Sequence, residues 1–399
     1  MKEPFLAAVP VLKKLESAGF EAYFVGGSVR DFLLNKEIND VDIATSATPE
    51  EVKRIFSKTV DVGIEHGTVL VLFQDHSYEI TTFRSEAEYE DFRRPKEVSF
   101  IRNLEEDLQR RDFTMNAIAM DKDGNLIDPF NGQLSIKNQV IQTVGKAVER
   151  FQEDALRMMR AVRFVSQLSF KIEKETINAL INLVHLLENI AVERKQAEFD
   201  KLLCGNDRKQ ALELILLTNI YSYLPGLSEQ QNSIKLMLEY QLEKLNRREM
   251  WALLVYCLRI EKKGIEGFLR EWRIPLKEIR EIQLILHYLY QRFQTSWSLY
   301  DLYTAGKEVF VSSENLYLVI KGIENQHTIQ HFLQLYDGLP IKERSEMDIT
   351  GNDLIDWFKK TGGPWVKETL LKIEHAILAG EIANNKIVIK EWLMECNHN

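Results

Sequence analysis

The sequence predicts an α+β protein in which the strands precede the helices. Short apolar runs, alternating with polar residues and separated by turn residues, fill roughly the first 140 residues of the chain. From Lys146 onward, apolar residues recur at the spacing of amphipathic helices, and no further pair of strands with turn residues follows. We therefore expect a small mixed or antiparallel sheet, followed by an extended all-helical part.

The composition is that of a soluble globular protein. Hydrophobic residues make up 45% and charged residues 28% of the 399 residues, a length that allows about two to four modules with cores. No run of about 18 apolar residues occurs, and charged residues interrupt the N-terminal segment, so we expect a cytoplasmic protein with no membrane partner. Cys204, Cys257 and Cys396 lack the spacing of metal ligands, which favours reduced thiols.

The net charge gives only a weak indication of the partner. A formal charge of −9 argues mildly against nucleic acid, since phosphate-binding surfaces are usually basic. A basic face can nevertheless exist within an acidic total. Charge alone therefore leaves RNA binding open.

One stretch near the N-terminus carries the chemistry around which the chain is organised. The apolar run 23–25 predicts a buried strand, Gly26 and Gly27 predict a tight turn, and Ser28 predicts the cap of a short helix. The free N–H groups of that helix would point back at the turn. Such a turn is a cradle for phosphate.

Asp40 and Asp42 follow this turn on a predicted strand. They alternate with Val41 and Ile43, so both carboxylates project from one face while the other face enters a core. Adjacent carboxylates repel unless a cation lies between them, and Mg²⁺ prefers one or two carboxylates completed by substrate phosphates. Alone, a Gly-Gly pair is more often a plain turn, and an Asp-x-Asp pair is more often two solvated acids. Together they indicate metal-assisted phosphoryl or nucleotidyl transfer.

These residues resemble the signature of a known family. Gly-Gly-Ser-Val-Arg-Asp at 26–31, Leu-Leu at 33–34 and Asp-Val-Asp at 40–42 are similar to class II, Bacillus-type tRNA nucleotidyltransferases and to bacterial poly(A) polymerases, within the polymerase β superfamily. The resemblance implies a polymerase β-like head. It also implies two Mg²⁺ ions held by Asp40 and Asp42, and phosphates gripped by Gly27 and Arg30.

A helix, a hairpin and a charged segment follow. Residues 47–56 predict a capped helix, and residues 67–73 with 78–83 predict a hairpin. Glu79 on its second strand could be a third metal ligand, although a single strand acid is more often at the surface. The charged segment 84–96 buries too little apolar surface to be rigid. In the resembled family a flexible loop here takes part in the change from C to A addition, so its presence implies the full activity.

The block 110–117 supplies candidate sugar ligands. An Arg-Arg-Asp run is usually a solvated face, but here apolar residues alternate with polar ones, and the block resembles the family's ribose-recognition motif. The resemblance assigns Arg111 and Asp112 to the sugar and phosphate region of the nucleotide. The segment 128–132 resembles the family's hinge between catalytic and nucleotide-reading parts.

A helix predicted over residues 151–165 carries candidate base ligands beside its apolar stripe. They are Asp154, Arg157, Arg160 and Arg163. Steps of three residues drift by about 60° around a helix, so Arg163 would lie far round from Asp154. The roles of Arg160 and Arg163 therefore rest on the resemblance, in which Glu-Asp-Ala-Leu-Arg and Arg-Ala-Val-Arg-Phe match the family's nucleotide-recognition motif.

Asp154 and Arg157 give a physical code for the base. Cytosine and adenine present an amino donor beside a ring-nitrogen acceptor, whereas uracil and guanine present a carbonyl beside a ring N–H. A carboxylate that accepts and a guanidinium that only donates would pair with C and A and reject U and G, because rejected bases leave buried polar groups unpaired. An aspartate and an arginine three residues apart more commonly form an exposed salt bridge on a helix.

The remainder offers module boundaries but few motifs. The tail segments 351–358 and 362–373 resemble those that hold the tRNA elbow in Bacillus-type enzymes. We expect a catalytic head at 1–140, a helical neck with base recognition at 141–200, a helical body at 201–310 and a helical tail that binds tRNA at 311–399.

The resemblance implies a template-independent enzyme that completes or repairs the 3′ CCA end of tRNA from CTP and ATP, with Mg²⁺ and release of pyrophosphate. The close alternatives are a poly(A) polymerase and a specialised A-adding or CC-adding enzyme. The alternative from another class is a non-catalytic RNA-binding protein, against which Asp40, Asp42 and Arg30 argue. Whether the chain forms a homodimer is left open.

Overall fold

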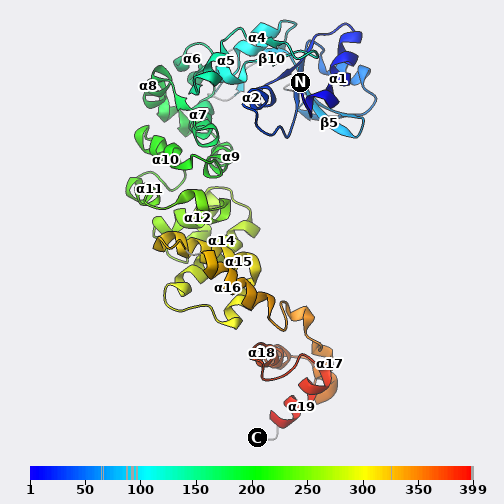
Figure 1. Ribbon diagram of the computed structural model, residues 1–399, viewed down its shortest axis with the longest axis vertical. Helices are drawn as coiled ribbons and strands as arrows, with labels where there is room; N and C mark the ends of the chain where they lie inside the picture. Colours follow the sequence, from blue (N-terminus) through cyan, green and yellow to red (C-terminus); the bar gives the residue numbers. More distant parts are fainter. Residues whose placement is uncertain are drawn as a thin grey trace. The chain divides into compact units, whose positions relative to one another are not determined.

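The computed structural model describes residues 1–63, 65, 67–86, 89–90, 94–95, 98–324 and 326–396 of the chain (Figure 1). These residues form two compact units. The first comprises Met1–Asn232 with Glu271–Arg273, and the second comprises Ser233–Arg270 with Ile274–Asn399. The four modules expected from the sequence divide the chain more finely and stay a prediction.

The first unit contains a seven-stranded mixed sheet, and the helices that follow it confirm the α+β prediction. β2 and β5 run parallel, and the other neighbouring pairs are antiparallel. In spatial order the strands are β11 (Leu126–Ile127), β10 (Ala119–Met120), β1 (Ala22–Val25), β2 (Asp42–Thr45), β5 (His76–Thr82), β4 (Thr68–Phe73) and β3 (Thr59–Gly63).

The predicted hairpin and the predicted helix cap are both confirmed. β4 and β5 turn at Gln74 and Asp75, whose positive φ values suit a two-residue hairpin loop. α3 (Pro49–Ile55) begins with a capping box in which Thr48 and Glu51 each accept from the other's backbone N–H.

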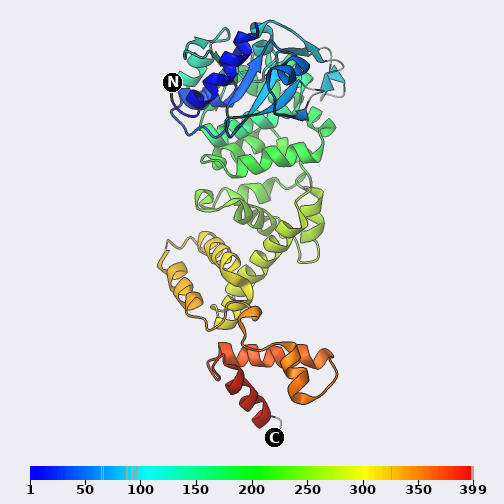
Figure 2. The same ribbon diagram turned by 90° about the vertical axis from the view of Figure 1, so that its right-hand side faces the viewer.

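Short helices lie against the sheet and in the connections that follow it. α1 (Phe5–Ser17) lies along the strands (Figure 2) and packs Phe5 on Phe24 of β1, with ring centroids 4.9 Å apart. The connections between the later strands contain α4 (Leu104–Gln109), the 3₁₀ helix η2 (Thr114–Asn116) and α5 (Gly132–Lys137).

Two predicted elements at the site are wrong in detail. Ser28 is not the cap of its helix, because α2 (Gly27–Leu33) starts after Gly26, and Ser28 Oγ donates to Val25 O at 2.9 Å instead. The helix predicted over 151–165 is broken at Asp154, whose extended backbone (φ −140°, ψ 102°) separates α6 (Ala147–Glu153) from α7 (Leu156–Leu168).

The charged segment that was predicted to be a flexible loop contains short strands among its described residues. β6 (Arg84–Glu86) pairs with β9 (Val98–Phe100), and β7 (Tyr89–Glu90) pairs with β8 (Arg94–Pro95). Residues 87–88, 91–93 and 96, which carry much of that prediction, lie outside the described residues.

The rest of the first unit is helical apart from one two-stranded pair. β12 (Val140–Ile141) runs parallel to β13 (Lys171–Ile172), a pair that the sequence did not predict. The helices that follow are α8 (Lys174–Leu183), α9 (Val192–Leu203) and α10 (Arg208–Leu217), with the 3₁₀ helices η3 (Val184–Asn189) and η4 (Ile220–Tyr223).

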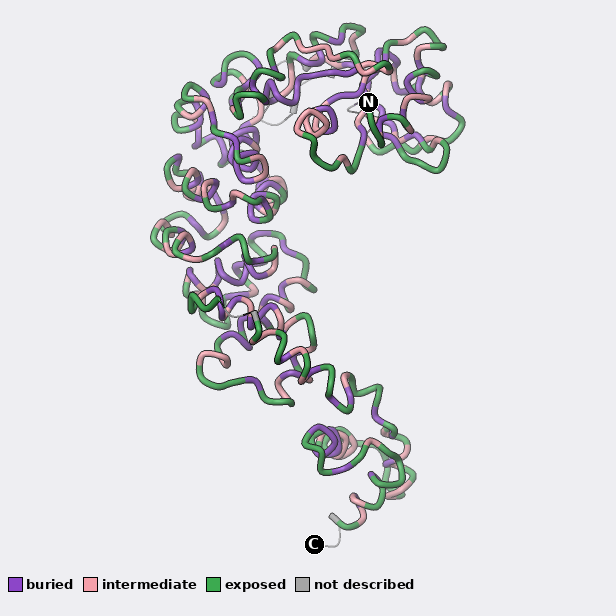
Figure 3. The backbone as a smooth tube through the Cα atoms, in the orientation of Figure 1, coloured by how far each residue is buried: buried purple, intermediate pink, exposed green. Residues whose placement is uncertain are grey.

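In the described residues after Ile172, every remaining element is a helix, as predicted. Buried residues occupy most of β1 and β2 and recur along the helices, where they alternate with exposed ones (Figure 3). The helices are α11 (Gln231–Met237), η5 (Leu242–Lys244), α12 (Arg247–Cys257), α13 (Ile265–Glu271), α14 (Leu276–Arg292), α15 (Leu299–Lys321), α16 (Gln326–Asp337), η6 (Arg344–Glu346), α17 (Gly351–Phe358), α18 (Pro364–Leu378) and α19 (Lys386–Cys396).

A buried ion pair fixes part of the second unit. Glu314 of α15 is fully buried and accepts from Arg292 Nε at 2.7 Å and from Trp297 Nε1 at 2.8 Å. The described helices include none that is both long and apolar enough to cross a bilayer.

Candidate nucleotide site

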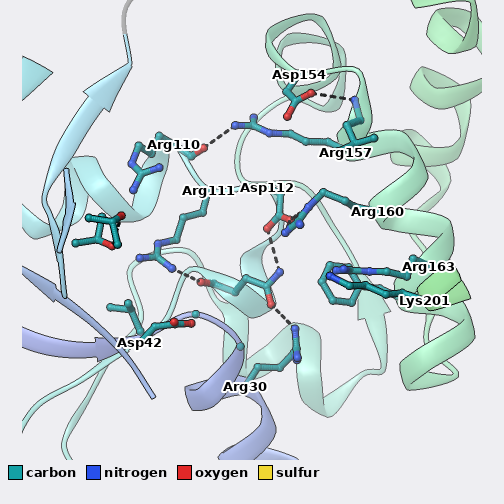
Figure 4. A pocket seen from close by; sticks show the side chains of 18 of the residues that line it. Arg30, Asp42, Arg110, Arg111, Asp112, Asp154, Arg157, Arg160, Arg163 and Lys201 are labelled. Carbon is teal, nitrogen blue, oxygen red and sulfur yellow. Dashed lines mark hydrogen bonds and ion pairs between the residues drawn. The ribbon is translucent and has the colours of Figure 1, made fainter. Parts of the chain in front are cut away.

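A cavity of about 980 Å³ in the first unit brings together most of the residues that the sequence singled out. Figure 4 shows Arg30 and Asp42 at one end, Asp154 and Arg157 at the other, and Arg111 and Asp112 between them. The predicted residues that line the cavity are Gly27, Arg30, Asp42, Arg111, Asp112, Asp154, Arg157, Arg160 and Arg163. Asp40 is exposed and is not among the described residues that line the cavity.

The turn at Gly26 requires glycine. Gly26 has a φ of +73°, and a Cβ there would approach Arg111 Nη1 to 3.3 Å and Asp42 Oδ2 to 3.5 Å. The backbone of the turn therefore comes close both to a guanidinium and to a candidate catalytic carboxylate. This close approach is what a phosphate cradle next to a metal site needs.

Asp42 has the environment of a cation ligand. It opens β2 between the buried Val41 and Ile43 and is the register partner of Glu79 on β5. The predicted alternation of burial is confirmed, but the prediction that Asp40 lies on the strand is wrong, because β2 begins only at Asp42. Burial and then Glu79 raise the pKa of Asp42, Arg111 opposes them, and Asp40 adds to the rise. Burial and Glu79 therefore disfavour the ionised form of Asp42, and a bound cation would relieve that cost.

The acidic residues fit a metal only together with substrate. In the part of the chain that the structure describes, no three His, Cys, Asp or Glu side chains are grouped so that they could hold an ion. Two carboxylates beside a phosphate cradle are, however, the donor set that Mg²⁺ commonly uses when substrate oxygens complete its coordination. Asp40 and Asp42 fit that pattern, and Glu79, which is exposed, lies next to Asp42 in the sheet.

Asp112 is held by four donated hydrogen bonds. Oδ1 accepts from Phe113 N at 2.8 Å and from Asn116 Nδ2 at 3.0 Å, and Oδ2 accepts from Nε and Nη2 of Arg160. Burial alone would raise the pKa of Asp112, but Arg160 and the donated bonds hold it well below its ordinary value of 3.8. A carboxylate offers about four acceptor positions, so these four bonds together fix the direction in which the Asp112 carboxylate faces the cavity.

Three guanidinium groups surround one buried phenyl ring. The carbon atoms at the centre of the guanidinium groups of Arg163, Arg30 and Arg160 lie 4.2, 5.1 and 5.7 Å from the ring centroid of Phe164. These distances suit cation–π attraction. Burial, opposed by Glu198, lowers the pKa of Arg163 to about 10. Phe164 thus holds together three cations that would otherwise repel one another.

Asp154 and Arg157 are held apart from each other by separate partners. Asp154 accepts from both Nη atoms of Arg194, whereas Arg157 donates to Glu153 Oε2 at 2.7 Å and to Arg110 O at 2.9 Å. The exposed salt bridge between Asp154 and Arg157 that the spacing favours is therefore not formed among the described contacts. Arg163 lines the same cavity as Asp154, and the helix expected to carry both is broken at Asp154.

The lining of the cavity is strongly basic. Nine basic and three acidic side chains line it as described. This surplus confirms that a basic face can exist within the acidic total of the chain. The basic residues are Arg30, Arg84, Arg110, Arg111, Arg157, Arg160, Arg163, Arg194 and Lys201.

Several residues of the site gave no usable signal in the sequence. Asp107, of which 1% is exposed, accepts from Arg110 at 2.8 Å and from Arg111 at 3.1 Å and so orients both on the cavity wall. Arg194 reaches the site from α9, and nothing local in the sequence marks it. Asn116 lies in the block 110–117, where alternation with apolar residues was the available signal.

Comparison with known proteins covers the whole chain. Three family models match: the Poly A polymerase head domain over residues 22–142, the probable RNA- and SrmB-binding site of polymerase A over residues 169–231, and the putative domain 2 of tRNA nucleotidyltransferases over residues 240–393.

Relatives of similar length are CCA-adding enzymes. The CCA-adding enzyme of Listeria monocytogenes serotype 4b (strain CLIP80459) is 52% identical over 395 residues, which cover 98% of this chain and 99% of that protein. The CCA-adding enzyme of Geobacillus sp. (strain WCH70) is 48% identical over 399 residues, 100% of this chain and 98% of that protein. A crystal structure of the Bacillus stearothermophilus CCA-adding enzyme in complex with CTP superimposes with a TM-score of 0.90 at 44% identity, covering 100% of this chain and 98% of that one.

Proposed function

The chain belongs to the family of CCA-adding enzymes, which are tRNA nucleotidyltransferases, and from this premise we propose that it builds and repairs the 3′ CCA end of tRNA with CTP and ATP. Addition is sequential and uses no nucleic-acid template. The observation that carries the proposal is the single basic cavity in which Asp42, Arg30 and the pair Asp154 and Arg157 converge.

The phosphates would bind at the end of the cavity formed by Gly27 and Arg30. Arg30 is one of the three guanidinium groups around Phe164, and it stands beside the turn that requires Gly26. Several cations around a triphosphate neutralise charge that builds up during transfer. Arg111 and Asp112 would bind the sugar and the adjoining phosphate.

The family uses a divalent cation, and we assign Mg²⁺ to Asp40 and Asp42, with Glu79 as a candidate third carboxylate. Bound Mg²⁺ would supply activation of the primer 3′-hydroxyl and neutralisation of the triphosphate, for in-line transfer with release of pyrophosphate. The raised pKa of Asp42 supports the assignment, since a cation beside it relieves repulsion from Glu79 and Asp40.

The base would be read at the other end of the cavity. Asp154 Oδ2 accepts a hydrogen bond from Arg194 Nη2 and keeps a second acceptor position for the amino group of C or A. Arg157 would donate to the ring nitrogen, and Arg160 and Arg163 would help to hold the nucleotide. This arrangement supports a choice of C and A over U and G that needs no template.

The tail also offers a surface suited to RNA. Helices α17 to α19 enclose a cavity of about 760 Å³ whose lining combines aromatic rings with lysines. Aromatic faces and cations together are a common basis for binding exposed nucleotides. The aromatic and lysine residues are Phe358, Trp365, Trp392, Lys360 and Lys372. We assign this region to the tRNA elbow, and a tRNA substrate implies a cytoplasmic enzyme.

The experiment that tests the function uses tRNA that lacks CCA. The purified protein is incubated with CTP, ATP or both, with and without Mg²⁺, and the 3′ ends are sequenced. Complete CCA ends that appear only with both nucleotides and Mg²⁺ are expected. Runs of A would indicate a poly(A) polymerase, ends that stop at CC would indicate a CC-adding enzyme, and unextended tRNA would overturn the proposal in favour of RNA binding alone.

A further inference from the structure

We infer that Asn116 is a positioning residue of the nucleotide site, which sets the directions of both Arg30 and Asp112. The inference rests on the proposed function, in which Arg30 binds phosphate and Asp112 binds the sugar. Asn116 ends η2, is 6% exposed and lines the cavity. Nothing above assigns it a role in the reaction.

The side-chain amide of Asn116 bridges two groups of opposite charge. Its Oδ1 accepts from Arg30 Nη1 at 2.8 Å, and its Nδ2 donates to Asp112 Oδ1 at 3.0 Å (Figure 4). An amide oxygen only accepts and an amide nitrogen only donates, so a single orientation satisfies both partners. The bridge therefore joins α2 to the block that follows α4, across 86 positions of sequence.

Asn116 completes the anchoring of Arg30. Nε and Nη2 of Arg30 donate to Asp31 at 2.9 and 3.0 Å, and Nη1 donates to Asn116. Of the five N–H groups of a guanidinium, these bonds leave one on each Nη atom. With three N–H groups fixed, the remaining two keep a set direction beside Gly27, whose Cβ position lies 3.6 Å from Nη2. Without Asn116, the Nη1 end loses its acceptor.

Asn116 also fixes the rotation of the Asp112 carboxylate. Arg160 engages Oδ2, whereas Asn116 and the backbone N–H of Phe113 engage Oδ1. The Phe113 bond comes from the adjacent residue and allows the carboxylate to turn. Loss of Asn116 would therefore leave the Phe113 N–H as the donor to Oδ1, and a sugar hydroxyl would meet a carboxylate whose direction is poorly defined. Discrimination between ribose and 2′-deoxyribose should suffer most.

The test compares binding of CTP and 2′-deoxy-CTP without tRNA, by calorimetry, in wild type and Asn116→Ala. We expect affinity for CTP to fall about tenfold and preference for CTP over 2′-deoxy-CTP to fall about tenfold, as for loss of a hydrogen bond to a charged group. Turnover on tRNA that lacks CCA is measured in parallel. Its KM for CTP should rise more than kcat falls, because Asn116 acts through groups that bind the nucleotide.

Thr114→Val is the matched control. Thr114 lies in the same turn and is 5% exposed, but its hydroxyl donates to Ser135 Oγ at 2.8 Å and it does not line the cavity as described. Both variants lose a buried hydrogen bond, so the unfolding temperature should fall in both. Only Asn116→Ala should lower the preference for CTP over 2′-deoxy-CTP.

Asn116→Asp allows the same measurement if the alanine variant does not fold. It preserves the size of the side chain and the acceptor for Arg30 but replaces the donor that faces Asp112, so the preference for CTP should again fall. If the folded variants kept the wild-type preference for CTP over 2′-deoxy-CTP, the inference about Asn116 would be overturned. The proposed function would still stand if the wild type added CCA. If wild type bound CTP but did not extend tRNA, the proposed function would fail and the binding comparison would still decide the role of Asn116. A wild type that bound neither nucleotide would overturn both.

Discussion

Both carboxylate oxygens of Asp154 accept from the guanidinium of Arg194, at 3.2 Å from Nη1 and 2.7 Å from Nη2. Arg194 stands on α9, and Asp154 is the extended residue between α6 and α7. Oδ1 also accepts from Leu156 N at 3.1 Å, so its two acceptor positions are filled. The pair thus leaves Oδ2 as the oxygen that can accept from a base.

Arg157→Ala should weaken the choice between C and U. Arg157 is fixed by Glu153 and by Arg110 O, and its remaining N–H groups are available to the ring nitrogen of C or A. Loss of this donor removes the penalty against a ring N–H, so U or G should enter while incorporation of C and A falls. The C-to-U preference should drop by about one to two orders of magnitude. The measurement is single-nucleotide incorporation of CTP and UTP into tRNA that lacks CCA.

Arg150→Ala is the control for Arg157→Ala. Arg150 shares the ion-pair partner Glu153, at 3.0 Å, but does not line the cavity as described. It should keep the wild-type preference. An unchanged C-to-U ratio with a uniformly lower rate for Arg157→Ala would mean that Arg157 holds phosphate or structure, and reading of the base by Asp154 and Arg157 would be wrong.

Asp40→Ala and Asp42→Ala should each abolish incorporation without unfolding the protein. Burial and the neighbouring Glu79 disfavour the ionised form of Asp42, so its removal relieves a cost in the metal-free fold. We expect thermal stability of Asp42→Ala equal to or above that of wild type without Mg²⁺. We also expect Mg²⁺ with CTP to stabilise wild type and not the variant. Substantial turnover by both variants would remove the two-metal assignment.

Arg160→Met should make stability depend on pH in a defined direction. In wild type the depressed pKa of Asp112 contributes stability that is present above the ordinary value of 3.8 and is lost as the pH falls through the native value. Without Arg160, burial acts on Asp112 with less opposition and its pKa rises. Near neutral pH the variant should therefore be less stable by about 1–3 kcal/mol, a range reduced because Arg160 is partly exposed.

The deficit of Arg160→Met should shrink as the pH falls below about 4, where Asp112 becomes protonated in the variant and the wild type loses its advantage. Urea unfolding of both proteins at pH 7 and at pH 3 measures it. A deficit of equal size at both values would show that Arg160 contributes by packing and not by pairing with Asp112.

The elements near the metal site were predictable because local chemistry determines them. The strand before Gly26, the alternation at Asp42 and the cap at Thr48 each depend on residues within a few positions, and each is confirmed. Ser28 was misassigned for a similar local reason. Gly26 at positive φ allows the helix to begin one residue earlier, so the serine hydroxyl turns back to Val25.

The end of the cavity at Asp154 was less predictable because it depends on contacts between distant segments. An apolar stripe predicts a continuous helix, but the helix breaks at Asp154, whose carboxylate pairs with Arg194 from α9. The sequence around either residue alone does not indicate this ion pair. The partners of Arg30 and Arg111, which are Asn116 and Asp107, likewise become visible only when the strands and α4 are assembled.

Phe164→Leu should weaken nucleotide binding more than it weakens the fold. Leucine keeps much of the apolar volume but has no π face for Arg30, Arg160 and Arg163. The three guanidinium groups would then repel one another and spread, so the KM for CTP and for ATP should each rise about tenfold, since desolvated cation–π contacts contribute up to about 2 kcal/mol each. Steady-state kinetics at several salt concentrations measure this, and added salt should reduce the difference by screening the repulsion.

Phe151→Leu separates that effect from general loss of packing. Phe151 is fully buried in α6 and does not line the cavity as described, so its replacement by leucine costs core contacts without touching the three arginines. Both variants should melt below wild type, but only Phe164→Leu should change KM. If the two variants raised KM equally, the ring of Phe164 would serve the core alone, and the arginines would have to be oriented by their carboxylate partners Asp31, Asp112 and Glu198.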